Sequence, residues 1–382
     1  MAGKEQKMIK EDKEIKDCRF KILTIVGARP QFIKSAIFTR SLSKRDDLKE
    51  VLVHTGQHYD ENMSRIFFEE LGMRKEDYNL NINGGNHGEQ TGRMLIDIER
   101  VVMNEKPDMI VVFGDTNSTL AGALVGSKLQ IPVAHIESGF RSHDMSMPEE
   151  INRIVADHVS AVLLCPTKTC IDELKNENVT ENVHFTGDIT YDAVMEYSKF
   201  ADGRKDCILD RLHLKKGSYI YSTVHRQGNT DSRESLENIF GAFLDSKETF
   251  VIPIHPRTKS KMIDFGIWNK YQGKTLVFID PVGFFDSLEL GMNCKKFVTD
   301  SGGLLKEAYY FRKPCIILRD TVEFIETVQN GEAILAGTDR KKILSAIKDF
   351  KGKGKYPSFF GEGDSVGKII GILSEYLKKR KL

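Results

Sequence analysis

Features that mark membrane, secreted or nucleic-acid-binding proteins are scarce in this sequence of 382 residues. No apolar run approaches the roughly 20 residues that cross a bilayer, and residues 1–19 mix Lys and Glu without the apolar segment of a signal peptide. The 56 Lys and Arg residues balance 55 Asp and Glu residues, which leaves a formal net charge of +1. So small a charge attracts neither nucleic acid nor an anionic membrane. We therefore expect a cytoplasmic protein that binds neither.

Cysteine is sparse, and histidine lacks metal-binding spacing. The six cysteines contain no Cys-x-x-Cys pair; they are Cys18, Cys165, Cys170, Cys207, Cys294 and Cys315. The histidines nearest to recognisable motifs form neither H-x-x-x-H nor H-E-x-x-H; they are His58, His135, His143, His225 and His255. We expect reduced, mostly buried thiols and no metal site.

What is present is a regular alternation of short β-branched runs and helical stretches. Strands are expected at residues 21–27, 50–56, 109–115, 131–137, 161–167, 219–225, 249–255, 275–280, 296–301 and 314–320. Near-continuous apolar strands separated by amphipathic helices are typical of parallel sheets covered on both faces. The length exceeds what one core usually serves. We predict an α/β protein with two Rossmann-like domains.

The series of strands divides near residues 187–218, and this gap sets the predicted domain ranges. Residues 20–188 form the first domain and residues 189–364 the second. Residues 1–19 are predicted to be a charged tail, because a charge run without an apolar stripe cannot build a core. The amphipathic helix predicted over residues 365–382 is expected to complete the first domain.

Small polar clusters follow almost every predicted strand. They read GARP, HTGQH, GDTNST, HIESG, VHR, HPR and DSGG in chain order. In open α/β sheets the ligand binds outside the carboxyl ends of the strands. We therefore expect the clusters of the two domains to meet at one site in the inter-domain cleft.

The second domain carries a candidate phosphate site in Asp300-Ser301-Gly302-Gly303. The motif ends a strand and opens a helix, where free backbone N–H groups attract an anion and glycine permits close approach. The alternative, purely structural interpretation of the motif is a serine N-cap with a tight turn. Two basic clusters at neighbouring strand ends favour a diphosphate ligand; they are His225-Arg226 and His255-Pro256-Arg257.

The common nucleotide motifs are absent. GARPQF follows the first strand where a dinucleotide site would have G-x-G-x-x-G, and no G-x-x-x-x-G-K-[ST] occurs. We expect no cofactor, and the anion is interpreted as part of a sugar nucleotide. In the first domain, Arg29 and Lys34 flank the helix after GARP, where they either balance phosphate charge or form a solvated helix end.

Three acids stand out at strand and helix ends of the first domain: Asp115, Glu137 and Glu149. Asp115 could be a helix N-cap. In MPEEINR, one of the two glutamates could be a partner of the helix dipole, an interpretation that suits Glu150 better than Glu149. Three acids at adjoining strand ends, facing a phosphate-binding domain, indicate proton transfer.

From about Lys21 to about Gly337, the sequence resembles the non-hydrolysing UDP-N-acetylglucosamine 2-epimerases. GARPQFIK is similar to the family's GTRPEAIK, FGDTNST to GDTTTT, IPVAHIESGFRS to IPVGHVEAGLRT and MPEEINR to PEEANR. In the second domain, VHR is similar to HRR, TDSGGLLKEA to TDSGGIQEEA and RDTVEFIE to RDTTERPE. The resemblance implies the glycosyltransferase-B fold, a homodimer and a UDP-sugar substrate.

The resemblance also implies site residues. The family's functional positions fall on Arg29, Lys34, Asp115, Glu137, Glu149 and His225. Its nucleotide-binding positions fall on Ser301, Gly302, Gly303 and Glu307, and the last of these contacts ribose.

The family is thought to expel UDP from C1 and to remove the C2 proton, which gives a 2-acetamidoglucal. Proton and UDP then add back with the C2 hydrogen on the other face. We assign Asp115 and Glu149 to proton transfer and Glu137 to the orientation of the sugar. His225 and Arg29 would stabilise the departing UDP, while Arg226, His255 and Arg257 would contribute to its binding.

Departures from the family pattern point to one branch. Gln31-Phe32 replaces Glu-Ala, and Gln227 stands where the usual family has a second Arg. The motifs GARPQFIK, HTGQHYDENMS, GGNHGEQTGRM, MPEEINR and IHPRT look more like the epimerases of UDP-2,3-diacetamido-2,3-dideoxyglucuronate. Either that sugar or UDP-N-acetylglucosamine is the expected substrate.

The alternatives are a glycosyltransferase of the same fold, a hydrolysing epimerase and a non-catalytic sensor of sugar nucleotides. The first would need an acceptor pocket, the second a GSRAEYG-like start, and the third would bind its ligand without exchange at C2. The retained acids favour epimerisation.

Overall fold

The structure is a computed structural model that describes residues 20–57, 71–204, 206–273 and 275–381. The predicted tail at residues 1–19 and the end of the HTGQHYDENMS motif lie outside this part. The chain divides into two compact units: unit 1 comprises Met1–Ala193 with Phe360–Leu382, and unit 2 comprises Val194–Phe359. The boundary between the units falls inside helix α8 (Ile189–Asp202), a few residues after the boundary that the sequence predicts.

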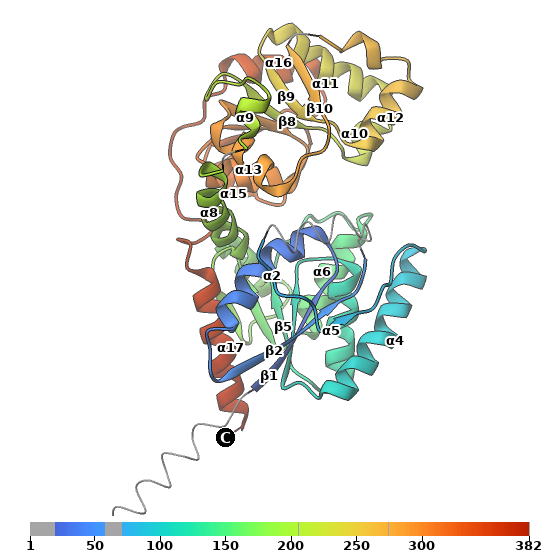
Figure 1. Cartoon of the computed structure of the whole chain (residues 1–382), viewed down its shortest axis with the longest axis vertical. Coiled ribbons are helices and arrows are strands. Elements are labelled where there is room, and N and C mark those ends of the chain that lie inside the picture. Colours follow the sequence, from blue (N-terminus) through green and yellow to red (C-terminus); the bar gives the residue numbers. More distant parts are fainter. Residues whose placement is uncertain (1–19, 58–70, 205, 274, 382) are drawn as a thin grey trace, which may run out of the picture. The chain divides into compact units, whose positions relative to one another are not determined.

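Unit 1 contains a seven-stranded parallel sheet in the order β3-β2-β1-β4-β5-β6-β7 (Figure 1). Its strands are β1 (Phe20–Val26), β2 (Leu48–His54), β3 (Tyr78–Asn79), β4 (Met109–Phe113), β5 (Val133–Ile136), β6 (Val162–Cys165) and β7 (Val183–Phe185). The central strands are buried along their whole length, as expected for strands covered on both faces.

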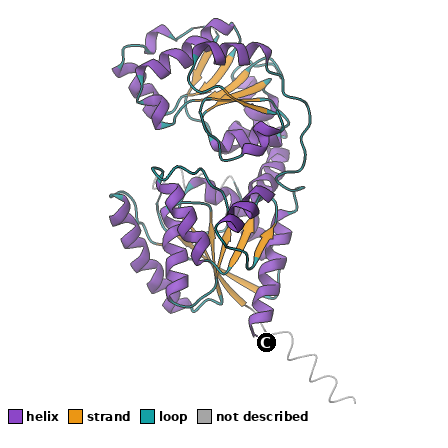
Figure 2. Cartoon of the chain, turned by 180° about the vertical axis from the view of Figure 1, so that it is seen from behind, coloured by secondary structure: helices purple, strands orange, loops and turns teal. Residues whose placement is uncertain are grey.

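Helices cover both faces of this sheet (Figure 2). They are α2 (Arg29–Leu42), α4 (His87–Glu105), α5 (Asn117–Lys128), α6 (Pro148–Val159), α7 (Lys168–Asn176), the start of α8, and α17 (Ser365–Lys381). One core cluster joins α4, α5 and α6 to the sheet, and it includes Ile25, Met94 and Ala121. Phe38 of α2 packs edge-on against Phe113 of β4, with ring centroids 5.8 Å apart.

The C-terminal helix belongs to unit 1. Ser374 of α17 donates to the Asp47 carboxylate at 2.8 Å, and the backbone N–H of Val366 donates to Asp192 at 2.8 Å. The backbone N–H of Asp188 donates to the Phe360 carbonyl at 2.8 Å, just before this helix. Helix α17 lies beside α2 (Figure 1).

Unit 2 repeats the arrangement with a six-stranded parallel sheet in the order β10-β9-β8-β11-β12-β13. Its strands are β8 (Ile220–Thr223), β9 (Phe250–Pro253), β10 (Leu276–Ile279), β11 (Lys296–Thr299), β12 (Cys315–Ile317) and β13 (Ala333–Leu335). Its helices are the end of α8, α9 (Ile208–Arg211), α10 (Gln227–Thr230), α11 (Arg233–Ser246), α12 (Pro256–Asp264), the 3₁₀ turn η2 (Trp268–Lys270), α13 (Phe284–Asn293), α14 (Gly302–Tyr310), α15 (Ile325–Gln329) and α16 (Arg340–Asp349).

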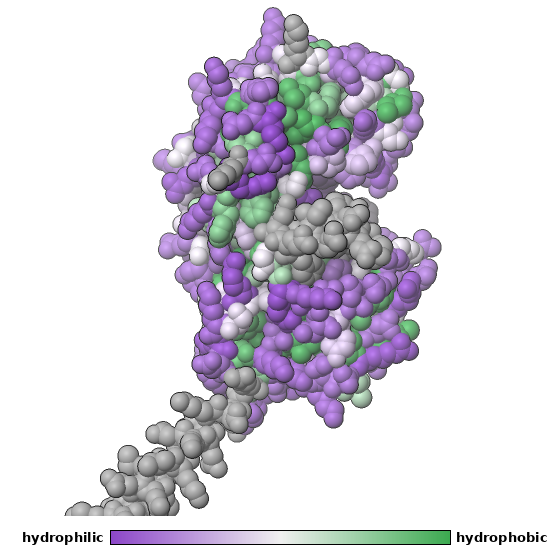
Figure 3. Space-filling model, viewed as in Figure 1, coloured by the Kyte–Doolittle hydropathy of each residue, from purple (hydrophilic) through white to green (hydrophobic). Residues whose placement is uncertain are grey.

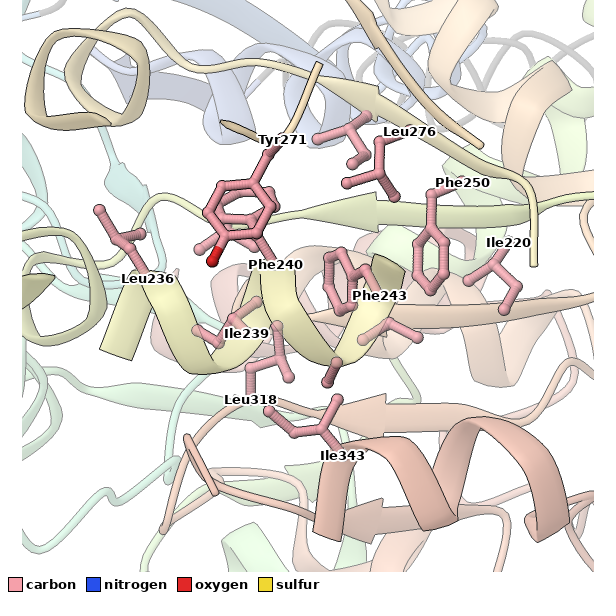
Figure 4. Close-up of a cluster of buried hydrophobic side chains, with 14 of the residues drawn as sticks. Ile220, Leu236, Ile239, Phe240, Phe243, Phe250, Tyr271, Leu276, Leu318 and Ile343 are labelled. Carbon is pink, nitrogen blue, oxygen red and sulfur yellow. The ribbon is translucent and has the colours of Figure 1, made fainter. Parts of the chain in front are cut away.

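The main core of unit 2 combines aliphatic side chains with four buried aromatic ones, Phe240, Phe243, Phe250 and Tyr271 (Figure 4). Phe240 and Phe243 of α11 point toward the sheet, and Phe243 stacks on Phe250 of β9 with ring centroids 4.2 Å apart. Side chains of this size bury the largest apolar area per residue, so this cluster holds α11 against the strands.

The ten strands expected from the sequence are all present. The short strands β3, β7 and β13 were not predicted. All three are edge strands of only two or three residues, which is too short for a recognisable hydrophobic pattern in the sequence. In the described part of the chain no helix is both long and apolar enough to cross a membrane. The face shown in Figure 3 is largely hydrophilic, with hydrophobic side chains gathered in places.

Candidate active site

Four of the predicted polar turns lie where the strand order of each sheet reverses. In unit 1 the order reverses between β1 and β4, and in unit 2 it reverses between β8 and β11. At such a switch point the helices after the two strands lie on opposite faces, and the turns leave room for a ligand. GARP follows β1 and GDT follows β4, while VHR follows β8 and DSGG follows β11.

Asp115 lies in the turn after β4, and its carboxylate is held from the side by an arginine. Arg153 of α6 donates to Asp115 Oδ2 at 2.5 Å, and the Asn152 side chain donates to the Asp115 carbonyl at 2.9 Å. The Asp115 side chain is 32% exposed. It is therefore fixed in direction while it stays open to a ligand. The N-cap of α5 is Thr116, so the sequence-based alternative that Asp115 is this cap is wrong.

Glu149 and Glu150 face different surroundings on the first turn of α6. Glu150 is buried; its Oε1 accepts from the backbone N–H groups of Ser142 and His143 at 2.9 Å each, and Arg153 donates to its Oε2 at 2.7 Å. Burial opposes ionisation, but these bonds hold the pKa of Glu150 below its ordinary value. Glu150 is structural, whereas Glu149 is exposed at the helix N-terminus.

Glu137 and Lys34 form a buried ion pair between the end of β5 and helix α2. Glu137 has a positive φ of 69°, a left-handed conformation that is unusual for a residue other than glycine. Such strain is characteristic of functional positions. Arg29 is the first residue of α2 and is half-buried, so it lies at the same edge of the sheet.

A charge network centred on the buried side chains of His135, Asp157 and Arg141 contacts the turn that carries Asp115. His135 Nε2 lies 2.7 Å from the Gly114 carbonyl, and its Nδ1 lies 2.7 Å from Asp157 Oδ1. Because a carbonyl only accepts, Nε2 must carry a proton. Arg141 donates to Asp157 Oδ2 at 2.7 Å and to both oxygens of Glu177. Neither this network nor the role of Arg153 was predicted from the sequence, although His135 and Arg141 lie in the HIESGFRS segment and Arg153 lies in EINR.

In unit 2, Asp300 shapes the turn after β8. Its buried carboxylate accepts from the backbone N–H groups of His225 and Arg226, at 2.9 Å each for the shorter contacts, and from the Asn229 side chain at 3.0 Å. Asp300 thus joins VHR to DSGG across the switch point. The rings of His225 and His255 lie 5.8 Å apart.

A second carboxylate anchors the arginines of this region. Arg319 forms two bonds to Glu323, of 2.8 and 2.9 Å, and Arg226 approaches Glu323 Oε1 at 3.4 Å. Burial opposes ionisation of Glu323, but Arg319 and then Arg226 lower the pKa of its carboxyl to about 2. Glu323 therefore stays charged at neutral pH.

The DSGG turn caps α14, and its glycines are not demanded by packing. The Ser301 hydroxyl accepts from the Leu304 N–H, and Glu307 is half-buried on the same helix. A Cβ added at Gly302 would meet Phe324 at 3.6 Å, and one at Gly303 would meet Ser301 at 3.8 Å, both ordinary contact distances. Neither glycine has a positive φ. Close approach of a ligand to the backbone is the remaining reason for two glycines here.

The substitution Gly302→Ala tests whether glycine is needed here for ligand binding and not for packing of the fold. We expect it to weaken UDP binding roughly tenfold, because its methyl group keeps a phosphate from the helix N–H groups. The melting temperature should stay the same or rise slightly, since alanine favours helix. Calorimetric titration with UDP measures the affinity. Gly371→Ala, in the exposed middle of α17, is the matched control, and equal affinity for all three proteins would contradict this interpretation.

His255 and Arg257 begin the helix after β9. His255 Nδ1 accepts from the Arg257 N–H at 3.2 Å, and burial, with His225 and Arg257 nearby, lowers the pKa of His255. Its Nε2 then carries the proton and can donate to a ligand. The Arg257 guanidinium is bound to Asp231 at 2.7 and 2.8 Å and to Thr230 at 3.0 Å, so it serves the α10–α12 contact.

Within the described residues, no group of three or more His, Cys, Asp or Glu side chains is arranged to hold a metal ion. The acids and arginines of unit 1 suit proton transfer, and the glycine-led helix N-terminus of unit 2 suits the binding of a phosphate.

Two parallel-sheet units with sites of this kind define a class of nucleotide-sugar enzymes. The family model of UDP-N-acetylglucosamine 2-epimerase matches residues 40–374, and the chain belongs to this family. It is therefore an isomerase of the epimerase type.

Individual relatives cover nearly the whole chain. It is 47% identical over 355 residues to a UDP-N-acetylglucosamine 2-epimerase homolog from Methanococcus maripaludis, covering 92% of this chain and 99% of the relative. It is 42% identical over 367 residues to the UDP-2,3-diacetamido-2,3-dideoxy-D-glucuronate 2-epimerase of Pseudomonas aeruginosa, covering 94% and 99%. Both branches that the sequence pointed to are therefore represented.

A solved structure confirms the fold. UDP-GlcNAc 2-epimerase from Methanocaldococcus jannaschii, in complex with UDP-GlcNAc and UDP, matches with a TM-score of 0.85 at 40% identity. The match covers 93% of this chain and 100% of that structure. The expected glycosyltransferase-B type of fold, with two Rossmann-like units, is confirmed.

Proposed function

We propose that this protein inverts C2 of a UDP-linked N-acetylated sugar without hydrolysis, for the synthesis of glycan or surface polysaccharide precursors. The first candidate substrate is UDP-N-acetylglucosamine, the sugar nucleotide in the names of several relatives. The second is UDP-2,3-diacetamido-2,3-dideoxyglucuronate. The observation that carries the proposal is Asp115 at the unit 1 switch point, fixed by Arg153 of α6, together with the exposed carboxylate of Glu149 on the first turn of the same helix.

The C2 proton is not acidic, so it is lost only with the departure of UDP from C1. Because the new proton adds to the opposite face of C2, the reaction needs a base on one face and an acid on the other. The C1–O bond breaks and UDP leaves with the electron pair. A carboxylate takes the C2 proton, and the C1=C2 double bond of a 2-acetamidoglucal forms. A second carboxyl group then delivers a proton to the opposite face of C2 while UDP adds back to C1. We assign these proton transfers to Asp115 and Glu149.

The buried pair Lys34–Glu137 suits a supporting role. The Glu137 side chain is 7% exposed, against 32% for Asp115, so we propose that Glu137 orients the sugar and leaves proton transfer to the more accessible acids. Arg29, at the same edge, would stabilise the phosphate charge that develops as UDP leaves.

Unit 2 is proposed to hold UDP throughout the reaction. The free N–H groups at the start of α14 would bind a phosphate, and Glu307 on the same helix would contact ribose. The cationic or donor groups of His225, Arg226 and His255 would surround the diphosphate. The support is their common position around the DSGG turn, where Asp300 fixes two of their backbones.

The decisive experiment is proton NMR in D₂O with each candidate sugar in turn, without added metal or nicotinamide. We expect a manno-configured UDP-sugar with deuterium at C2, and the faster substrate identifies the branch. Free sugar accumulating with UDP would indicate a hydrolysing enzyme. Absence of exchange with both sugars would contradict the proposal and favour a transferase or a sensor.

A homodimer in the cytoplasm remains the proposal for assembly and location. Exposed hydrophobic side chains on α4 and α6, which both pack against α5, support a face that contacts a second copy: Ile96 (55% exposed) and Met103 (60%) on α4, and Ile151 (45%) on α6. Sedimentation equilibrium tests it, and a monomer at micromolar concentration would contradict it.

A further inference from the structure

One buried amide connects the two turns that meet at the switch point of unit 1. Gln31, on the first turn of α2, is 2% exposed. Its Oε1 accepts from the backbone N–H groups of Gly27 at 2.7 Å and Ala28 at 3.0 Å. Its Nε2 lies 2.8 Å from the Phe113 carbonyl and also near the Thr116 and Thr119 hydroxyls, at 3.0 and 3.1 Å.

The orientation of this amide is fixed by its partners. A backbone N–H group can only donate, so the atom facing Gly27 and Ala28 must be the oxygen. A backbone carbonyl can only accept, so the atom facing Phe113 must be the nitrogen. The Thr119 hydroxyl donates to the same carbonyl at 2.6 Å, which leaves its lone pairs for Gln31.

Each half of the amide holds the backbone beside one proposed site residue. Gly27 and Ala28 immediately precede Arg29. Phe113 lies two residues before Asp115, and Thr116 directly follows it. Strands β1 and β4 are paired neighbours, so the two turns start side by side.

The Gly27 turn also packs closely on the first turn of α5, the helix that follows Asp115. A Cβ added at Gly27 would lie 2.1 Å from Ser118 Oγ and 2.2 Å from Thr55 Oγ1, so only glycine fits there. The Ser118 and Thr55 hydroxyls are themselves bonded at 2.8 Å. The backbone before Arg29 is therefore in close contact with the start of the helix after Asp115.

We propose that Gln31 is a positioning residue, which sets the Asp115 carboxylate relative to Arg29 and so to the reacting carbons of the substrate. It does not touch the substrate. This inference rests on the proposed function, and it gives a physical role to a position where the sequence departs from the family, with glutamine in place of glutamate. The donor half is the part that a carboxylate lacks, because ionised glutamate cannot donate to the Phe113 carbonyl.

Two substitutions separate the halves. Gln31→Met keeps the length of the side chain but removes both halves, and Gln31→Glu keeps the acceptor half alone. We expect Gln31→Met to lower kcat by roughly 10–10² with little change in KM, since small misplacements of a reacting group cost this much. Gln31→Glu should fall between Gln31→Met and the wild type.

Thr39→Val is the matched control. Thr39 is a buried residue of the same helix, and its hydroxyl donates to Glu50 Oε1 at 3.1 Å, away from the switch point. Its substitution removes a buried hydrogen bond from α2 without touching either turn. It should lower the melting temperature in a similar way and leave kcat unchanged.

Hydrogen exchange followed by mass spectrometry tests the connection without any substrate. Gln31→Met should speed amide exchange about fivefold or more at residues 27–28 and at 114–119. Gln31→Glu should speed it at 114–119 alone, and Thr39→Val at neither segment. This readout stands even if the wild type fails to exchange C2 of either sugar, so failure of the proposed function is seen separately.

Either of two results would overturn the proposal. One is a Gln31→Glu protein with the kcat of the wild type, which would show that the bonds to the Asp115 turn do not matter. The other is a Thr39→Val protein that loses as much kcat as Gln31→Met, which would reduce the effect of Gln31 to general destabilisation.

Discussion

Asp115→Asn should lower turnover by roughly 10²–10⁴ while the affinity for UDP stays within about twofold of the wild type, because a lost acid or base has effects of this size. The asparagine keeps the shape of the side chain and can still accept a bond from Arg153. It cannot take up or release a proton. Steady-state epimerisation and the wash-in of deuterium at C2 measure the loss, and calorimetry with UDP measures the binding.

Asp144→Asn is the matched control for this substitution. Asp144 is an exposed acid of unit 1 whose carboxylate accepts from the Ser146 N–H and hydroxyl, and the Asp144→Asn protein should retain full turnover. Near wild-type turnover of Asp115→Asn would exclude proton transfer by Asp115. It would leave Glu149 as the one remaining acid of the proposed pair.

Asp157→Asn is expected to destabilise unit 1 by about 3 kcal/mol, since removal of one partner leaves a buried charge uncompensated. Arg141 keeps its bonds to Glu177, which places the effect at the lower end of the range for buried pairs. Urea unfolding followed by circular dichroism measures the loss. The only tryptophan, Trp268, lies in unit 2, so its fluorescence reports unfolding of that unit separately.

The same network predicts how the stability of unit 1 depends on pH. Burial works to raise the pKa of Asp157, but His135 and Arg141 hold it below its ordinary value. A carboxyl group whose folded pKa is depressed stabilises the fold above its unfolded pKa, near 3.9, and this stability is lost as pH falls through the folded pKa. At acid pH, the free energy of unfolding should therefore fall less steeply with decreasing pH in Asp157→Asn than in the wild type. Glu173→Gln, which alters a pair with the exposed His143, should change neither measurement.

The fold was predictable because its signals are local. Each long strand is an apolar run such as 109–115, and each ends in a polar turn, so the alternation of strands and helices gives two parallel sheets. The edge strand β3, with Tyr78 and Asn79 alone, carries no such pattern. Its pairing with β2 depends on tertiary contacts that no short window contains.

Candidate site residues could be proposed from the sequence one by one, but their hydrogen-bond partners could not. Asp115, Glu149 and the DSGG turn were found from their places after strands and at helix starts. The partner of Asp115 is Arg153, which lies 38 residues away in the chain and approaches because α6 packs on α5. Likewise, Gln31 was noticed only as a departure from the family. Its bonds to Phe113 and Thr116 cross the sheet, and sequence spacing does not report them.

The division of the chain also bears on synthesis by the ribosome. Unit 2 is one continuous segment, Val194–Phe359, whereas unit 1 needs α17, which is translated after unit 2. Until that helix emerges, the face of α2 that it covers stays open, and the Asp47 and Asp192 carboxylates lack the bonds that the helix supplies. Unit 2 can therefore reach its native state on the nascent chain first. A nascent chain that has emerged only as far as residue 359 would contain a complete unit 2 and an incomplete unit 1.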